Sequence, residues 1–582
     1  MDNVSDYKSL IRSIINNQYI YTSCKINDDL SPYIIEQSHK ILNESKDKID
    51  GNGNTILMYI CMCYTHNNIF DIIEILKSAR MVQNKNGMTA LMFACKNHKY
   101  NTLLKIVELL YDTRTLQNND GMTALMFACK NPKYGTVLKI VKLLNDTRCV
   151  QNNDGMTALM FACMCYTQPD LFKIVEMLND TRWLHTKNDM TALMYLCIHH
   201  IHPDILKIAE ILKDTDTLRS DTGDTALIYV CKIYNNPNLL GLVEILKHTC
   251  NVQNNNGWTA LMCLCTNYNQ PNLPEIVEML KDSMKLQNNK GDTALMIICS
   301  NNSKPNLPEI VEMLKDTMNI QNNEGSTALM IICSNNKHDN LPKVVEMLKD
   351  SMKLQDKYGV TALMVACKYY NKPNLPEIAE MLKDTMHIQD RCDMTALMLA
   401  CKYYNKPNLP EIVEMLKHTC LVQNKDGNTA LMFACINYNK PNLPEIVEML
   451  KHTCLVQNKD GMTALMYICT NYEYPKIQEI VEILKDSKHL INNAGFAYIN
   501  ILNRYILSKN VRYTFNDILD KSIDMEPASS VYDGCCICMI NKSNVKFELC
   551  KIHLSGCLNC VKGLKKLECP LCRTVSNTLM IV

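Results

Sequence analysis

The hydrophobic residues along most of the chain recur in one pattern with a period of 34 residues. In each period a threonine precedes an apolar triplet, usually Ala-Leu-Met, and a second apolar stripe with helical spacing follows. Every interval between successive threonines is 34 residues, without an insertion. This period predicts a solenoid of stacked helical units. The threonines are Thr55, Thr89, Thr123, Thr157, Thr191, Thr225, Thr259, Thr293, Thr327, Thr361, Thr395, Thr429 and Thr463.

The period that covers residues 421–450 illustrates one unit. Gly427 ends a polar stretch, where a glycine can supply the positive φ that a turn requires. Thr429 is placed to cap a short helix over residues 430–435, whose side chains are all apolar. Pro444 suits the first turn of a second, amphipathic helix. Neither helix buries its apolar surface alone, so the units must stack.

The segment TALMFAC at 429–435 resembles the TPLHxAA core of the ankyrin repeat. The resemblance implies a mostly α-helical ankyrin-repeat solenoid. Methionine replaces the family's histidine in twelve units and Ile228 replaces it in the other, which predicts loss of that family's side-chain hydrogen-bond network. A longer loop between the helices and a shorter segment before the next turn predict stunted hairpin fingers.

The repeat pattern sets the expected domain boundaries. Full units occupy residues 51–495, and residues 1–50 hold a degenerate half-unit that we expect to cap the N-terminal end. Residues 496–523 read as a helical cap at the other end, since a solenoid must shield its open ends from water. Residues 524–534 read as a linker.

The residue before each threonine is a candidate binding position. By resemblance to ankyrin repeats it lies at an exposed finger tip, and a stripe rich in methionine there would suit adaptable protein binding. The alternative is that short fingers fold back and bury these side chains against each other. The candidates are Met88, Met122, Met156, Met190, Trp258, Met394 and Met462.

Two positions of the first helix also repeat. A cysteine recurs in all thirteen units, from Cys61 to Cys469, and we interpret it as a small residue tolerated where helices crowd rather than as a metal or redox array. Aromatic residues recur two places earlier, and we interpret them as packing between units. They are Tyr59, Phe93, Phe127, Phe161, Tyr195, Tyr229, Phe433 and Tyr467.

Composition and charge narrow the class of protein. The chain has 582 residues, of which 47% are hydrophobic and 21% charged, as in globular proteins. Its net charge of +1 predicts no general attraction to nucleic acid or to membranes. No apolar run approaches the roughly 20 residues that span a bilayer, and the N-terminus is a poor signal peptide. Thirty cysteines in these positions fit a reducing, intracellular compartment.

The last fifty residues contain a different pattern, four pairs of metal-binding residues. Two ligands separated by two residues can bind one metal from a single tight turn, and eight ligands fill two closed tetrahedral zinc sites. Spacing alone leaves open which pairs share a metal. No position remains for a substrate or an activated water, so this zinc would be structural. The ligands are Cys535, Cys538, Cys550, His553, Cys557, Cys560, Cys569 and Cys572.

The order of these ligands resembles the RING finger, here over residues 535–573. The resemblance implies a cross-brace around two zinc ions: Cys535, Cys538, Cys557 and Cys560 hold one, and Cys550, His553, Cys569 and Cys572 hold the other. Cys536 is spare. A disulfide framework conflicts with His553 at the family's histidine position, and a nucleic-acid-binding zinc module would need more than the few lysines present.

Active RING fingers dock a ubiquitin-conjugating enzyme, and matching residues are present. Ile537, Leu564 and Pro570 correspond to apolar contacts of the docking groove. Arg573 corresponds to the arginine that bridges the conjugating enzyme and its thioester-linked ubiquitin, a role for a planar cation with several donors. The resemblance implies a ubiquitin ligase with no covalent catalytic residue, whose partners are the conjugating enzyme, ubiquitin and a protein target held by the repeats.

The combination of ankyrin repeats with a RING finger resembles predicted ubiquitin ligases of large DNA viruses of amoebae. That resemblance implies a location in the host cytoplasm or nucleus. One alternative is a non-enzymatic scaffold with a structural zinc module. Another is an adaptor for a separate ligase, although residues 496–530 show no clear box motif. The tail at 574–582 is short and apolar, and it lacks the aromatic residues that would favour a RING dimer.

Overall fold

The structure is a computed structural model of the chain. It describes residues 49, 51–501, 545–547 and 579–581, apart from short gaps within 51–501. The predicted N-terminal cap, most of the predicted C-terminal cap and the predicted linker therefore lie outside the described residues. The gaps are 64–69, 71–72, 75, 97–102, 132–136, 166–167, 200–201, 234–236, 267–271, 302–305, 336–340, 371, 438–441, 471–475 and 499.

The chain divides into two compact units, residues 1–289 and residues 290–582. In each of them the 34-residue repeats begin with a short helix. In residues 1–289 these first helices are α3 (Ile56–Cys63), α5 (Ala90–Lys96), α7 (Ala124–Lys130), α9 (Ala158–Cys165), α11 (Ala192–His199), α13 (Ala226–Lys232) and α15 (Ala260–Thr266). In residues 290–582 they are α17 (Ala294–Ser300), α19 (Ala328–Ser334), α21 (Ala362–Tyr369), α23 (Ala396–Tyr403), α25 (Ala430–Ile436) and α27 (Ala464–Cys469).

A second helix follows the first in the repeats, and a three-residue 3-10 helix follows the second, as at Tyr111–Thr113. In residues 1–289 the second helices are α6 (Leu103–Leu109), α8 (Val137–Leu144), α10 (Leu171–Leu178), α12 (Ile205–Leu212), α14 (Leu239–Leu246) and α16 (Leu273–Leu280). In residues 290–582 they are α18 (Leu307–Leu314), α20 (Leu341–Leu348), α22 (Leu375–Leu382), α24 (Leu409–Leu416), α26 (Leu443–Leu450) and α28 (Ile477–Ile483).

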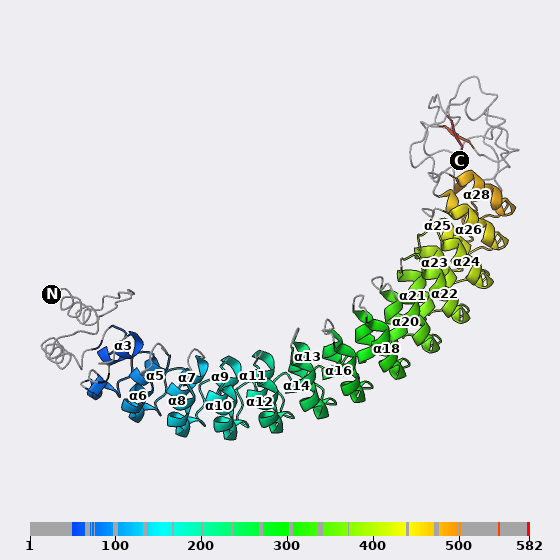
Figure 1. Cartoon of the computed structure of the whole chain (residues 1–582). Coiled ribbons are helices and arrows are strands. Elements are labelled where there is room, and N and C mark those ends of the chain that lie inside the picture. The colour runs from blue at the N-terminus through cyan, green and yellow to red at the C-terminus, as the bar shows by residue number, and fades with distance from the viewer. Residues whose placement is uncertain are drawn as a thin grey trace, which may run out of the picture. The chain divides into compact units, whose positions relative to one another are not determined.

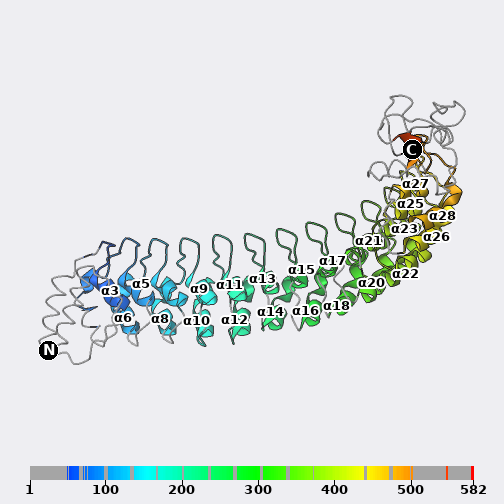
Figure 2. The same cartoon turned by 90° about the horizontal axis from the view of Figure 1, so that it is seen from above.

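The helices of successive repeats pack in two rows within each unit (Figure 1). First helices contact first helices, as α7 contacts α5 and α9, and second helices contact second helices, as α8 contacts α6 and α10. Figure 2 shows the loops that join one repeat to the next projecting along one side of these rows. The predicted stacking of helix pairs is confirmed.

Each first helix begins at the repeated threonine, as predicted. Thr123 has extended backbone geometry, and its hydroxyl accepts a hydrogen bond from the backbone N–H of Met126 at 3.3 Å. The sulfur of Met126 in turn accepts from the N–H of Thr123 at 3.5 Å. The sequence predicts that methionine abolishes the family's side-chain hydrogen bonding here. The structure corrects this for the first three repeats, where the thioether is a weak acceptor for the backbone N–H of the threonine.

The polar turn before each threonine needs a residue with positive φ. Gly121 has φ +77°, and a Cβ added there would lie 2.7 Å from the backbone nitrogen of Asn153 in the next repeat. Two repeats place an aspartate there instead, Asp189 at φ 56° and Asp393 at φ 59°. A short polar side chain tolerates this conformation better than most residues do. The glycine predicted for the turn is confirmed, for example at Gly427 with φ +82°.

The core lies within and between the helix pairs. In α25 every residue from Ala430 to Cys435 is buried, as predicted for a short helix packed between two neighbours. In α26 only one stripe is buried, and it includes Leu443, Ile446 and Leu450. Pro444 stands in the first turn of α26, as predicted. On the exposed side of this helix Glu448 pairs with Lys451.

The cysteines that recur in the first helices are buried as free thiols, from Cys61 to Cys469. Burial raises the pKa of the Cys61 thiol to about 12, and it raises the pKa of Cys333 and Cys469 to about the same value. A thiol with so high a pKa stays protonated at neutral pH and is a poor nucleophile and metal ligand. The interpretation of these cysteines as packing residues is confirmed.

Beyond the repeats, the structure describes the backbone of two short strands. β1 (Val545–Phe547) pairs antiparallel with β2 (Leu579–Ile581), with Lys546 opposite Met580. Among the described residues, none of the helices combines the length and the apolar character that crossing a membrane requires. Within the same residues, no group of three or more histidine, cysteine, aspartate or glutamate side chains is placed to bind a metal ion.

Candidate functional site

The finger turns that join successive repeats are linked to one another by amide side chains. Gln117 donates from its side chain to the carbonyl of Gly121 in its own turn at 2.7 Å and to the carbonyl of Gln151 in the next repeat at 3.1 Å. Asn119 donates from its side chain to the carbonyl of Lys85 in the preceding repeat at 2.8 Å. The recurrent Gln-Asn-Asn sequence therefore fixes each finger against its neighbours.

In several repeats the side chain of the residue before the threonine accepts a hydrogen bond from the next repeat. The side-chain amide of Asn152 donates to the sulfur of Met122 at 3.5 Å, and that of Asn424 donates to the sulfur of Met394 at 3.5 Å. Asn118 and Asn492 make the corresponding contacts to Met88 and Met462. Where the position is polar, an oxygen takes the place of sulfur, as in the 2.8 Å hydrogen bond from Asn322 to Asp292.

This geometry corrects the expectation that the methionine stripe is exposed at finger tips. Met88, Met122 and Met394 are only 5–6% exposed. Met156, Met190, Trp258 and Met462 are partly buried. The sulfurs of Met88, Met122, Met394 and Met462 face the turn of the following repeat. This agrees with the alternative that the side chains are covered, although these four lie against the next turn and not against each other. A role in binding a partner stays a prediction for the four partly buried residues.

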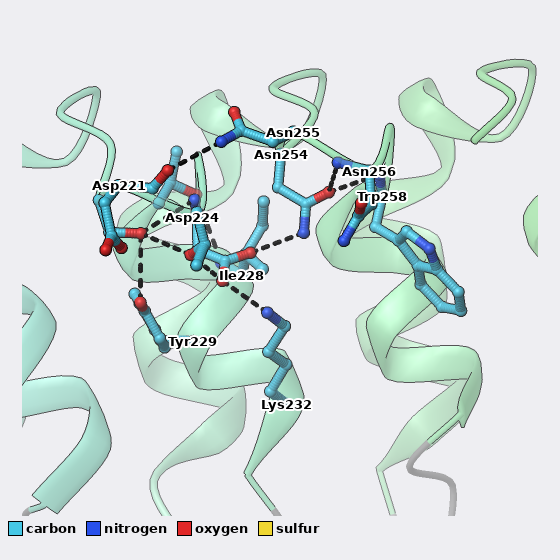
Figure 3. Close-up of polar contacts among 12 residues, drawn as sticks. Asp221, Asp224, Ile228, Tyr229, Lys232, Asn254, Asn255, Asn256 and Trp258 are labelled. Atoms are coloured by element: carbon cyan, nitrogen blue, oxygen red, sulfur yellow. Dashed lines mark hydrogen bonds and ion pairs between the residues drawn. The ribbon is translucent and has the colours of Figure 1, made fainter. Parts of the chain in front are cut away.

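One departure from the repeat creates an ion pair with a buried carboxylate (Figure 3). Asp224 stands at a position where six of the thirteen repeats have methionine, and its side chain is 4% exposed. Its carboxylate lies 2.6 Å from the ammonium of Lys232 and accepts hydrogen bonds from Thr222 at 2.9 Å and from Asn254 at 2.8 Å. A buried carboxylate with this many partners is satisfied. The cluster therefore satisfies the hydrogen-bonding capacity of the buried carboxylate within the fold.

Trp258 is the largest side chain among the predicted finger residues. Its backbone N–H donates to the side-chain oxygen of Asn254 at 2.9 Å, and Figure 3 shows the indole directed away from Asp224. Because the ring is partly exposed, it can contribute apolar contact area to a partner.

The aromatic residues of the first helices pack between repeats, as predicted. Phe161 and Phe433 are 3% and 6% exposed, and the others are partly buried. Lysines of the preceding repeat lie over two of the rings, with Lys130 5.4 Å from the ring centroid of Phe161 and Lys402 5.3 Å from that of Phe433.

Sequence reasoning missed one exposed cluster on the first helices. Tyr369 and Tyr403, the last residues of α21 and α23, are 50% and 45% exposed. Lys368 and Lys402 precede them. We call these four residues the Lys–Tyr patch. The sequence contains Lys-Tyr-Tyr at the same position of two consecutive repeats. The 34-residue period alone does not show which tyrosine of each pair faces outward.

The predicted zinc ligands and docking residues, 535–573, lie outside the described residues, except that the backbone of β1 falls within this range. This applies to the eight ligands from Cys535 to Cys572 and to Ile537, Leu564, Pro570 and Arg573. Zinc binding and contact with a conjugating enzyme therefore stay predictions.

Comparison with known proteins bears on the repeats. The family model for ankyrin repeats, which describes three copies, matches more than half of the chain in overlapping segments. No curated protein matches the chain. The matched segments are residues 24–113, 99–180, 233–318, 268–350, 298–391, 331–420, 370–454 and 397–495.

Among solved structures, the crystal structure of the ankyrin repeat domain of Bcl-3, described as a unique member of the IkappaB protein family, is similar to this chain. The two share 20% sequence identity over 40% of this chain and 99% of that chain, with a TM-score of 0.29. A similarity of this size bears on neither the arrangement of the helices nor the function.

Stacked helix pairs joined by hydrogen-bonded fingers define a repeat protein that binds other proteins through its surface. The chain belongs to the ankyrin repeat family.

Proposed function

We propose that the chain is a RING-type ubiquitin ligase in which the ankyrin repeats hold a protein target and the C-terminal segment docks a ubiquitin-conjugating enzyme. The observation that carries the proposal is the spacing of eight cysteine and histidine side chains between Cys535 and Cys572. The many free buried thiols of the repeats suit a reducing, intracellular compartment. The arrangement resembles predicted ligases of large DNA viruses of amoebae, and such a protein would act in the host cytoplasm or nucleus.

The donor set fits two structural zinc ions. Seven cysteines and one histidine, in four pairs, supply four nitrogen or sulfur ligands for each ion, which is the number that a closed tetrahedral site takes. Zinc would hold the fold of this segment, and binding of a structural zinc contributes on the order of 10–16 kcal/mol. The same eight residues leave no open coordination position, so the chemistry of transfer falls to the docked enzyme.

The docking residues follow from the resemblance to RING fingers. Ile537, Leu564 and Pro570 would form an apolar groove for the conjugating enzyme. Arg573 would hydrogen-bond to the enzyme and to the ubiquitin linked to it, since its guanidinium offers several donors in one plane. Restraining the thioester-linked ubiquitin in a reactive pose accelerates attack by a lysine of the target without a covalent step on this chain.

The repeats would act by raising the local concentration of the target. A target bound to the repeats of the same chain meets the docked enzyme as an intramolecular partner, which increases the rate of transfer without a new catalytic contact. The exposed Lys–Tyr patch and the partly exposed Trp258 are among the surface features of the described repeats that would contribute to such binding.

The proposal is tested with the purified full chain, activating enzyme, a panel of conjugating enzymes and ubiquitin. We expect self-ubiquitylation, and we expect Arg573→Ala to reduce its rate by about a hundredfold while the bound zinc is retained. Arg219→Ala, at an exposed arginine of the repeats, is the matched control and leaves the rate unchanged. The absence of self-ubiquitylation with every conjugating enzyme of the panel would instead favour a non-enzymatic scaffold.

A further inference from the structure

The Lys–Tyr patch lies at the C-terminal ends of α21 and α23, and the loops that follow these two helices are hydrogen-bonded to each other. Tyr370 and Tyr404, which follow the exposed tyrosines, are only 1% and 2% exposed. The hydroxyl of Tyr404 lies 3.0 Å from the carbonyl oxygen of Lys372 in the preceding repeat and 2.8 Å from the side-chain oxygen of Asn408. Asn408 donates to the carbonyl of Pro373, also in the preceding repeat. One tyrosine of each doublet thus fixes the position from which the other projects.

The four residues of the patch form a continuous row of cations and rings. The ammonium of Lys368 lies 4.7 Å from the ring centroid of Tyr369 and 5.7 Å from that of Tyr403. The ammonium of Lys402 lies 5.1 Å from the centroid of Tyr403 and continues the row to Phe433. Cation–π contacts hold the lysines near the rings and reduce the entropy that they lose when a ligand binds.

The helices and loops that carry the patch contribute lysines and no acid, and the acid that acts on Lys368 is Asp390, in the finger turn before α23. Residues 362–376 and 396–410 contain lysines and no acidic residue. The lysines that end the second helices differ in this respect, since Lys383 pairs with Glu380 and Lys417 with Glu414. Within the part of the chain that the structure describes, neither Lys368 nor Lys402 makes an ion pair.

We propose that the Lys–Tyr patch is a docking site for an extended acidic peptide segment of a partner protein. Carboxylates would pair with Lys368 and Lys402, and an apolar or proline side chain between them would lie against Tyr369 and Tyr403. The two lysines occupy equivalent positions on neighbouring first helices, which pack roughly 8–10 Å apart. An extended chain in the polyproline II conformation rises about 3.1 Å per residue with three residues per turn, so carboxylates three residues apart lie on the same side and match this spacing, as in Glu-x-x-Glu.

The charge of the surrounding surface favours a peptide over a nucleic acid. Binding to a nucleic acid draws on many phosphate contacts, whereas the finger turns next to the patch carry acids as well as bases, with Asp390 and Asp393 beside Arg391. Two fixed lysines and two exposed rings match a short acidic motif of the kind that a linear peptide presents. This assignment rests on the target-holding half of the proposed function and does not depend on zinc or on ubiquitin transfer.

The experiment measures the affinity of the full chain for a fluorescent peptide of about twelve residues that contains Glu-Leu-Pro-Glu. The readout is fluorescence anisotropy. Because each charged pair supplies a charge-assisted hydrogen bond, we expect the double variant Lys368→Ala/Lys402→Ala to weaken binding by roughly tenfold or more, and added salt to weaken binding to the unmodified chain. A peptide in which glutamines replace both glutamates is expected to lose affinity to the same extent.

The matched control is Lys96→Ala/Lys130→Ala, which removes lysines from the same position of α5 and α7, where asparagine follows instead of tyrosine. We expect this control to change the affinity by less than about twofold. Equal binding by the Lys368→Ala/Lys402→Ala variant, no binding of the peptide, or tighter binding of a single-stranded oligonucleotide at the same residues would overturn the assignment.

A parallel self-ubiquitylation assay separates the two proposals. If the peptide binds through the patch but the chain is inactive with every conjugating enzyme, the docking site is supported and the ligase function is contradicted. If the chain is active but binding of the peptide does not depend on Lys368 and Lys402, the ligase function is supported and this docking site is contradicted.

Discussion

The cysteines of the first helices and those of the C-terminal segment differ in how they recur along the sequence. Cys435 is fully buried in α25 among apolar side chains, and burial keeps such thiols protonated. The cysteines from Cys535 to Cys572 recur instead in pairs whose spacing is typical of metal ligands. The same residue type thus fills a core in the repeats and is proposed to bind zinc near the C-terminus. Periodicity and spacing, not abundance, distinguish the two uses.

The largest effect is expected from removing two proposed ligands. Cys557→Ser/Cys560→Ser would remove half of one zinc site, and the loss of a structural zinc costs on the order of 10 kcal/mol. We expect the segment to unfold and trypsin to cleave it rapidly after Lys562, Lys565 and Lys566. Cys536→Ser is the control and should leave cleavage slow. Equal resistance of both variants would show that the ligand assignment is wrong.

A smaller effect is expected from the corresponding change in the repeats. Cys435→Ala removes only a buried sulfur and should lower the free energy of unfolding by about 1 kcal/mol. Cys435→Ser places a hydroxyl among apolar neighbours and should lower it by about 1–3 kcal/mol. Urea denaturation followed by circular dichroism measures both. The zinc content should not change, and a change would mean that this cysteine is more than a packing residue.

The two groups of cysteines should also respond oppositely to pH. The pKa of Cys61 is raised by burial from 9.0 to about 12, so its contribution to stability is complete below pH 9 and is lost as the pH rises toward 12. Each such thiol lowers the free energy of unfolding by about 1.4 kcal/mol for every pH unit in that range. The melting temperature of the repeats should therefore fall steeply above about pH 9. The zinc segment should instead fail in acid, where its ligands become protonated.

The smallest effect is expected for the rates at which iodoacetamide alkylates the different cysteines, which are measured on the folded chain. Cys149 and Cys392 are exposed and should be alkylated more than about tenfold faster than the buried cysteines of the first helices. The proposed zinc ligands should become reactive only after chelation. Mass spectrometry of peptides from the labelled chain identifies the modified sites. Rapid labelling of Cys435 in the folded chain would contradict its burial.

The local structure of each repeat could be predicted from the sequence because it is set by neighbouring residues. The glycine of the turn, the threonine cap and the proline of the second helix each act within a few positions. The placement of Met122 could not be predicted in this way, because its sulfur faces Asn152, thirty residues later in the chain. The outward direction of Tyr369 was missed for a similar reason, since it depends on the loops that Tyr370 and Tyr404 hold.

The methionine stripe shows that contacts between repeats can cover apolar residues that the sequence pattern alone predicts to be exposed. Apolar residues at an expected finger tip favour a binding surface when each turn is considered alone. Once the turns stack, the same residues become acceptors and packing partners between repeats. The exposed Lys–Tyr patch shows the converse, because two ordinary lysines become a distinct surface only when α21 and α23 lie side by side.

Zinc content tests the central claim most directly. Elemental analysis of the purified full chain should find two zinc ions per chain, and the variant Cys569→Ser/Cys572→Ser should contain less, while the helical content of the repeats stays the same. A full chain without zinc, or a variant that keeps as much zinc as the unmodified chain, would contradict the assignment of the C-terminal cysteines and the ligase function that depends on it.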